Sequence, residues 1–130
     1  MKTSDLIYWY KFFNRKYFGN RLPKHLWVHF GKLKRNRLGE TRFRKLCSKC
    51  DKCIQLRKRF KKEIKNDFLP HDIRINQKFK SGLGCDEMSI TTLLHEMVHI
   101  SISAKYHHGP KFKKELRRLM TVGAFDRVLC

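Results

Sequence analysis

The chain has 130 residues, a length that suits one domain and leaves no room for a second hydrophobic core. Its 31 lysines and arginines outnumber its 11 aspartates and glutamates, so the formal net charge at pH 7 is +20. So many positive side chains repel one another in the folded state, and a protein this basic usually binds a polyanion. We expect nucleic acid as that partner; an anionic membrane surface and a purely solubilising charge are the alternatives.

The apolar stretch over residues 6–18 is interrupted by charged and polar side chains. It therefore matches neither a signal peptide nor a membrane span. We expect an intracellular, non-secreted monomer with no membrane contact, located in the cytoplasm or nucleoid, or in the nucleus if the source is eukaryotic. In that setting the five cysteines are expected to be reduced thiols or metal ligands rather than disulfides.

Helical and alternating patterns occur in turn along the first part of the chain. Apolar side chains at helical spacing predict a first helix over residues 4–18. The apolar run over residues 26–30 predicts a strand, and a less regular alternation over residues 37–43 predicts a second one. A third short strand is predicted over residues 72–76.

The segment 44–69 differs in composition, because lysine and arginine dominate and the apolar residues form only a thin stripe. We interpret it as a basic, cysteine-containing helical insertion that Pro70 closes. A helix over residues 86–103 and a last helix beginning at Pro110 follow. The predicted fold is a single α+β domain over residues 1–130. It has a short, mostly antiparallel sheet of about three strands, packed against the three helices outside the insertion.

The motif His95-Glu96-Met97-Val98-His99 lies within the predicted apolar helix. Its two histidines are four residues apart, just over one turn, so both imidazoles project from one face and can hold one zinc ion. Glu96 then lies close enough to contact a zinc-bound water without ligating the metal, and can take a proton from it. Burying two histidines and a carboxylate without a metal would be costly, which disfavours a chance match.

A catalytic zinc ion needs a third protein ligand and one open position. Ile102 and Lys105 stand where the metzincin arrangement needs a glycine and a histidine, which excludes that class. His107, His108 and Glu115 remain as candidates. A turn after the motif helix would fold the chain back over the metal and favours the histidines, but spacing does not choose between them.

Several segments of the chain resemble a SprT-like (Spartan-type) metalloprotease domain over residues from about 6 to 120. They are Phe13-Asn14, Tyr17-Phe18-Gly19-Asn20-Arg21-Leu22-Pro23, Thr92-Leu93-Leu94-His95-Glu96-Met97-Val98-His99 and His108-Gly109-Pro110-Lys111-Phe112. The last two are specific in combination. The basic segment 44–69 has no counterpart in the resemblance, and no zinc ribbon follows the core.

The resemblance implies a compact zincin-like fold in which His108 is the third zinc ligand and Glu96 the catalytic base. It also implies a zinc-dependent endopeptidase of the HExxH type that acts on proteins bound or crosslinked to DNA, a task in DNA repair, with DNA as an activator. Because no ribbon is seen, DNA binding is expected to come from the protease domain itself. The net charge leads to a nucleic-acid partner independently.

Three cysteines spaced three residues apart, Cys47, Cys50 and Cys53, share one broad face if the segment is helical. Cys85 or His71 could complete a second, structural zinc site with them. The alternatives are three reduced thiols on a solvated basic helix, and an iron–sulfur run that lacks its fourth cysteine before a proline. Cys130 is given no role.

Positive charge is dense enough around the insertion to track nucleic-acid phosphates without reading sequence. The candidate residues are Lys34, Arg35, Arg37, Arg42, Arg44, Arg57, Lys58, Arg59, Lys61 and Lys62. Trp27, Phe43 and Phe60 could stack on bases if exposed, although the first two are on predicted strands and are expected in the core. The alternative for the charges is a solvated surface.

Two other functions compete with the endopeptidase. One is a non-proteolytic, zinc-containing nucleic-acid-binding module, which would have no need of the Glu96 carboxylate. The other is a metal-dependent hydrolase acting on nucleic acid or another substrate, which the resemblance disfavours. The presence of Glu96 therefore favours the protease.

Overall fold

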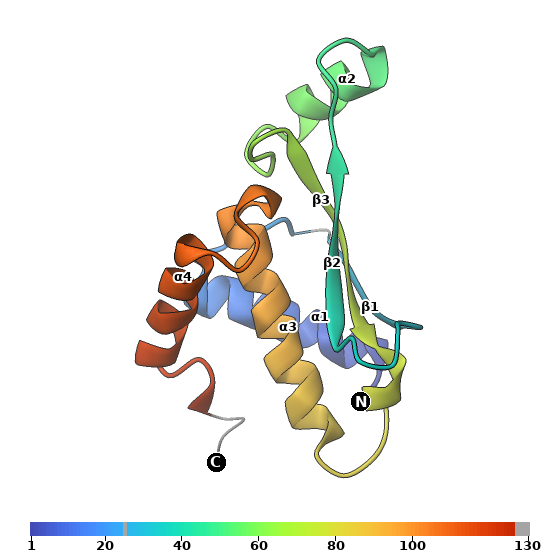
Figure 1. Ribbon diagram of the computed structural model, residues 1–130, viewed down its shortest axis with the longest axis vertical. Coiled ribbons are helices and arrows are strands. Elements are labelled where there is room, and N and C mark those ends of the chain that lie inside the picture. Colours follow the sequence, from blue (N-terminus) through green and yellow to red (C-terminus); the bar gives the residue numbers. More distant parts are fainter. Residues whose placement is uncertain (25, 127–130) are drawn as a thin grey trace.

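The computed structural model describes residues 1–24 and 26–126, which form four α-helices, three strands and two short 3-10 helices (Figure 1). In chain order these elements are α1 (Thr3–Tyr17), β1 (Trp27–Gly31), β2 (Gly39–Lys45), α2 (Asp51–Arg59), β3 (Phe68–Asn76), η1 (Gln77–Phe79), α3 (Cys85–Ile102), η2 (Ala104–Tyr106) and α4 (Pro110–Thr121). The predicted α+β class and its three strands are confirmed. Cys130 lies outside the described residues.

The sheet is mixed and has the order β1-β3-β2. β3 is its central strand and pairs parallel with β1 and antiparallel with β2, the latter over the longer register. Central position suits β3, because its Ile73 and Ile75 are fully buried. The connection between β1 and β2 is therefore not a hairpin turn, and β2 is an edge strand.

β3 begins earlier than predicted, at Phe68 instead of residue 72, and includes Pro70. Proline has no N–H to give to a strand ladder, and the register of β2 with β3 shifts between Arg42 and Phe43, passing over His71. Pro70 therefore lies at a bulge within the strand and does not close the insertion. Beyond the bulge, β2 and β3 extend away from the helices and carry α2 at their end (Figure 1).

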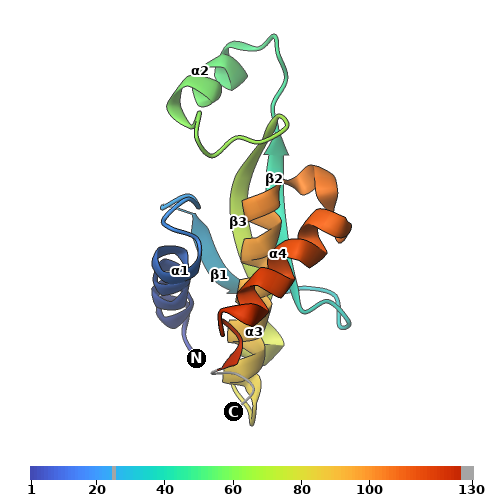
Figure 2. The ribbon, with the colours of Figure 1, turned by 90° about the vertical axis from the view of Figure 1, so that its left-hand side faces the viewer.

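The central helix α3 lies between the sheet and α4, and α1 packs against both β1 and α3 (Figure 2). Four apolar side chains of α3 are fully buried and form much of the core: Leu93, Leu94, Met97 and Val98. The packing leaves one face of α3 turned towards β2. That face carries the motif histidines and Glu96.

A buried carboxylate joins the three strands. Asp72 of β3 is fully buried and accepts two hydrogen bonds from the Arg42 guanidinium of β2, both at 2.7 Å. His29 Nε2 of β1 lies 2.8 Å from Asp72 Oδ2, and His71 Nδ1 lies 3.0 Å from Oδ1. Burial raises the pKa of Asp72, but the hydrogen bonds from Arg42, His29 and His71 outweigh it and leave this pKa well below the usual carboxyl value. Arg42 therefore has a structural partner within the sheet.

We expect Asp72→Asn to lower the free energy of unfolding by about 2–4 kcal/mol, below the top of the range for buried pairs because Arg42 is partly exposed. Since the folded pKa of Asp72 lies below the unfolded one, its contribution is present at neutral pH and lost as the pH falls below the ordinary carboxyl range. Urea denaturation at neutral and acidic pH measures both effects. Asp67→Asn removes an exposed pair with Arg57 and is the control, with an expected cost under about 1 kcal/mol. Equal costs for the two variants would contradict this role of Asp72.

Candidate metal and active site

The first ligands come from the middle of α3. Gly84, in the left-handed conformation with φ 76°, starts the helix, and Asp86 and Glu87 in its first turn suit the positive end of the helix dipole. His95 and His99 follow on the face turned towards β2 and are partly buried. The motif thus projects both imidazoles from a rigid, well-packed helix, as predicted.

The turn after α3 returns the chain over this face. Ser103 and His107 both have positive backbone φ angles, 97° and 43°, which residues other than glycine rarely adopt. The turn is held by the end of the insertion, where Asn66 Nδ2 donates to Ser103 Oγ at 3.0 Å and Lys65 Nζ donates to the Ser101 carbonyl at 2.5 Å. This geometry places residue 108 above α3 before α4 begins.

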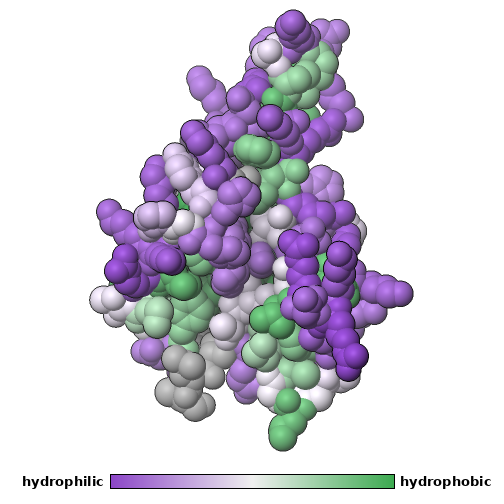
Figure 3. Space-filling model, viewed as in Figure 1, coloured by the Kyte–Doolittle hydropathy of each residue, from purple (hydrophilic) through white to green (hydrophobic). Residues whose placement is uncertain are grey.

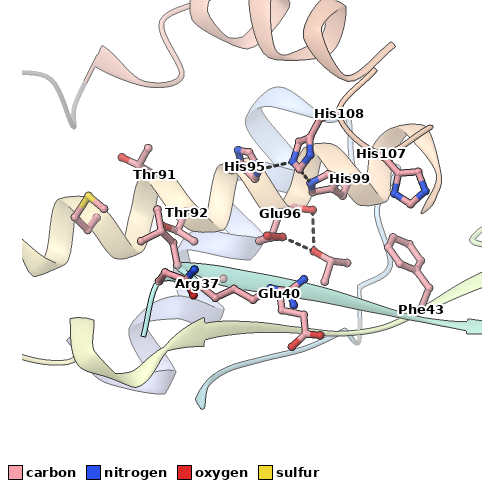
Figure 4. Close-up of a pocket in the computed structure, with 15 residues that line it drawn as sticks. Arg37, Glu40, Phe43, Thr91, Thr92, His95, Glu96, His99, His107 and His108 are labelled. Carbon is pink, nitrogen blue, oxygen red and sulfur yellow. Dashed lines mark hydrogen bonds between the residues drawn. The ribbon is translucent and has the colours of Figure 1, made fainter. Parts of the chain in front are cut away.

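Three imidazole nitrogens converge at this point (Figure 4). His108 Nε2 lies 3.2 Å from His95 Nε2 and 3.2 Å from His99 Nε2. Two nitrogens bound to one tetrahedral zinc ion at about 2.0–2.1 Å are about 3.3 Å apart, so the observed spacing fits a shared metal. One ring nitrogen carries at most one hydrogen and cannot donate to both neighbours, so hydrogen bonding alone does not explain the cluster.

The structure places His108, and neither alternative, in the ligand group. His107 lines the cleft beside the group, and the Glu115 carboxylate binds the Arg118 guanidinium at 2.6 Å. The buried ring of Phe112 supports the cluster, with its centroid 4.6–4.9 Å from those of the three imidazoles. The His-Gly-Pro-x-Phe segment therefore supplies both a ligand and the apolar surface against which the ligands pack.

Burial and the nearby histidines favour the neutral form of His95 and His99 by lowering the pKa of each. Burial lowers the pKa of His95, with the charge of His108 as a further cause. Burial also lowers the pKa of His99 to about 4, assisted by the neighbouring histidines. A neutral imidazole is the form that ligates a metal, so the site is prepared for an ion at neutral pH.

Glu96 is buried and lies next to the ligands on α3, where Thr41 Oγ1 of β2 donates to its Oε2 at 2.9 Å (Figure 4). Burial raises the pKa of Glu96 to about 7, against the opposing effects of the Thr41 hydrogen bond and of the Arg37 charge. A carboxylate with a pKa near the working pH can both take and return a proton. This environment suits a general base rather than a structural carboxylate.

A close approach of β2 to α3 creates this contact. A Cβ atom at Gly39 would lie 2.6 Å from Thr92 Cγ2 and 3.4 Å from Glu96 Cγ, so only glycine fits there. Sequence reasoning missed Gly39 and Thr41 as site residues. No local pattern marks them, because their role depends on a contact between β2 and a helix more than fifty residues away.

The histidines and Glu96 face a cleft of about 600 Å³ between α3 and β2. Its lining residues are Asn36, Arg37, Leu38, Gly39, Glu40, Thr41, Phe43, Met88, Thr91, Thr92, His95, Glu96, His99, His107 and His108. One wall is thus an edge strand, whose free backbone groups can pair with an extended polypeptide. The cleft is large enough for several residues of such a chain.

The three cysteines of the insertion also come together. The sulfur atoms of Cys47, Cys50 and Cys53 all lie within 4.8 Å of one another. Hydrogen bonds from the Cys50 side chain and backbone and from the Lys49 backbone lower the pKa of Cys47 to about 6. Cys85 is not part of the group, because it begins α3 at the opposite end of the molecule from α2 (Figure 1).

Nor does His71, the other candidate for a fourth ligand, join the cysteines: its Nδ1 lies 3.0 Å from the Asp72 carboxylate. The predicted set of four is therefore corrected: the structure brings three cysteine sulfurs together and places neither Cys85 nor His71 with them. Cys85 instead packs against the core, with its sulfur 3.9 Å from the Lys78 carbonyl. The places of Cys85 and His71 depend on how distant elements pack, which local sequence patterns do not reveal.

The predicted nucleic-acid-binding residues fall into two regions. Lys34, Arg35 and Arg37 lie in the loop between β1 and β2, and the rest extend from the end of β2 over α2, where hydrophilic residues dominate the surface (Figure 3). Most are exposed, namely Lys34, Arg35, Arg37, Arg44, Lys58, Arg59, Lys61 and Lys62. Arg42 is the exception already described, and Arg57 pairs with Asp67 at 2.9 Å.

Two further surface features differ from expectation. Trp27, expected in the core, is 55% exposed and stacks on the His29 ring at 3.7 Å. The outer side of α4 carries a basic stretch that sequence analysis did not single out, formed by Lys111, Lys113, Lys114 and Arg117, all exposed.

Within residues 1–24 and 26–126, no helix combines the length and apolar character needed to cross a bilayer.

Three imidazole nitrogens at zinc-ligand spacing, with a buried carboxylate beside them at an open cleft, define a metalloprotease-like domain with a metal site suited to zinc. A model of the SprT-like family matches residues 6–128, nearly the whole chain. The protein therefore belongs to the SprT-like family, and the resemblance seen in the sequence is confirmed. Comparison with curated proteins and with solved structures gives no match.

Proposed function

We propose that this protein is a zinc-dependent endopeptidase that cleaves proteins associated with DNA. The observation that carries the proposal is the position of Glu96, buried beside the three converging histidines and facing a cleft walled by an edge strand. A purely structural zinc site is closed and does not need a poised carboxylate. For this reason the non-proteolytic binding module is the weaker alternative.

His95, His99 and His108 would hold the zinc ion, which when bound would polarise a peptide carbonyl and acidify a water molecule. Glu96 would accept the proton of that water at its carboxylate and return it to the leaving amine. Thr41 holds the carboxylate in place through its hydrogen bond at 2.9 Å. The free edge of β2 would bind the substrate as an extended strand alongside the cleft.

The basic surfaces support the nucleic-acid part of the proposal. The β1–β2 loop borders the cleft through Arg37, while the α2 region carries eight exposed lysines and arginines between residues 44 and 62. Such charges bind phosphates through counterion release and read no bases. Binding of DNA on these surfaces would bring a DNA-bound protein to the cleft. The enzyme would then prefer DNA-bound substrates without a pocket that reads their amino-acid sequence.

Affinity for single-stranded DNA should fall steeply with salt, by roughly 100-fold between about 50 and 200 mM if about five phosphates are contacted. Replacing Lys58, Lys61 and Lys62 by glutamate should weaken binding and flatten this dependence, because phosphate contacts are lost. Fluorescence anisotropy measures both. The matched control carries glutamate at Lys2, Lys11 and Lys16, exposed residues in and next to α1. An affinity indifferent to salt, or an equal loss in the control, would refute a phosphate-binding surface at α2.

A further inference from the structure

The group formed by Cys47, Cys50 and Cys53 lies at the end of the molecule remote from the histidines, and nothing in the proposed reaction uses it (Figure 1). Its sulfur atoms are within 4.8 Å of one another. Sulfurs bound to one tetrahedral zinc ion at about 2.3 Å are about 3.8 Å apart. The three side chains therefore need shifts of only about 1 Å to reach the spacing of a zinc–thiolate site.

The backbone around the group is arranged for negatively charged sulfur. The Cys50 N–H points to Cys47 Sγ, and the Cys53 N–H to Cys50 Sγ, each with a nitrogen–sulfur distance of 3.4 Å. Cys50 is the N-cap of the nine-residue helix α2, so the positive end of the helix dipole faces the sulfurs. Three thiolates and one divalent ion leave a net charge of −1, which Lys49 and Lys52 between the cysteines can offset.

The α2 region also lacks a core of its own. Cys53 is the only buried residue of α2, and Leu46 is the one other buried side chain between residues 44 and 67. α2 makes no extensive packing contact with any other described element. A nine-residue helix is not stable alone in water, and segments this poor in buried apolar surface are usually held by a disulfide or a metal. The four free cysteines among the described residues include these three, so a disulfide does not hold the segment.

We propose that Cys47, Cys50 and Cys53 bind a second zinc ion, which fixes α2 to the end of β2. Thiolate ligands select zinc over hard cations such as magnesium or calcium. Among the described residues, no further histidine, cysteine or carboxylate joins the three, so the fourth position is left to water. This site is independent of the proposed protease activity, and its test needs no substrate.

Metal analysis of protein purified with a non-thiol reductant tests the proposal. We expect two zinc ions per chain in the wild type, and one after replacement of Cys47, Cys50 and Cys53 by serine. Cys85→Ser is the matched control and should keep both ions, because Cys85 lies at the other end of the molecule. The double variant His95→Ala/His108→Ala should also keep one ion, held by the cysteines. One zinc per wild-type chain that the triple serine variant retains would overturn the proposal.

Cobalt substitution of the wild type keeps the test decisive even if the triple variant does not fold. Cobalt bound to thiolates gives sulfur-to-metal charge-transfer absorption, which a histidine site does not give. We expect this absorption in the wild type and in Cys85→Ser, with a d–d spectrum of tetrahedral type. Its absence in wild-type protein that has bound two equivalents of cobalt would refute thiolate ligation.

Discussion

Glu96→Gln is expected to lower the turnover of a protein substrate by about 100- to 10,000-fold, the usual contribution of a general base. The amide keeps the size of the side chain and can still contact Thr41, but it cannot accept a proton at pH 7. Zinc content and DNA affinity should remain at wild-type levels, because neither depends on this carboxylate. Single-turnover cleavage measured by gel electrophoresis gives the rate, and metal analysis and anisotropy give the other two quantities.

Two variants set the scale for this result. Glu87→Gln changes the same group on the same helix at an exposed position in the first turn and should keep the wild-type rate. Thr41→Val should give a smaller loss than Glu96→Gln, since it keeps the base and removes the hydroxyl that lies 2.9 Å from Glu96 Oε2 and 3.3 Å from the Glu96 carbonyl. A Glu96→Gln protein with normal turnover would show that Glu96 is not the base.

His108→Ala should weaken zinc binding at the histidine site by roughly 100-fold or more, since even the loss of a residue that only supports a ligand costs about 10- to 100-fold. His107→Ala, which removes the neighbouring imidazole lining the same cleft, should leave the affinity close to that of the wild type. Competition with a chromophoric chelator measures the affinity. A background with Cys47, Cys50 and Cys53 replaced by serine ensures that only the histidine site is counted.

The same pair of variants should separate in thermal stability. Zinc stabilises the folded state by an amount that rises with the logarithm of the ratio of its concentration to the dissociation constant, so the wild type and His107→Ala should melt at a higher temperature with zinc than without it. His108→Ala should lose most of this increase. If His107→Ala lost zinc and His108→Ala kept it, the assignment of the third ligand would be reversed.

The chemistry carried by local spacing was predictable from the sequence. His95 and His99 lie just over one turn apart on an apolar helix, so their common face follows from helix geometry alone. The third histidine of the group needed more information, because a turn with positive φ at Ser103 and His107 decides which imidazole lies beside His95 and His99. The family resemblance indicated His108, while spacing left His107 equally open.

What the sequence could not predict depends on contacts between distant elements. Thr41 reaches Glu96 only because β2 packs against α3, and Arg42 is withdrawn from the basic surface by Asp72 on a neighbouring strand. Cys85 resembled a fourth metal ligand in the sequence, but α3 starts at the far end of the molecule from α2. Strand order has the same origin, since the central position of β3 follows from its buried isoleucines and not from chain order.

The measurement that tests the central claim most directly is cleavage of a basic DNA-binding protein by the zinc-loaded wild type, with and without single-stranded DNA. Both the protein and the DNA are examined for products, beside Glu96→Gln and a chelator-treated sample. We expect protein fragments that increase with DNA and are absent from both controls, while the DNA stays intact. Cleavage of the DNA itself, dependent on Glu96, would contradict the account and identify a metal-dependent nuclease. Tight DNA binding with no cleavage of either substrate would contradict it in favour of a non-proteolytic binding module.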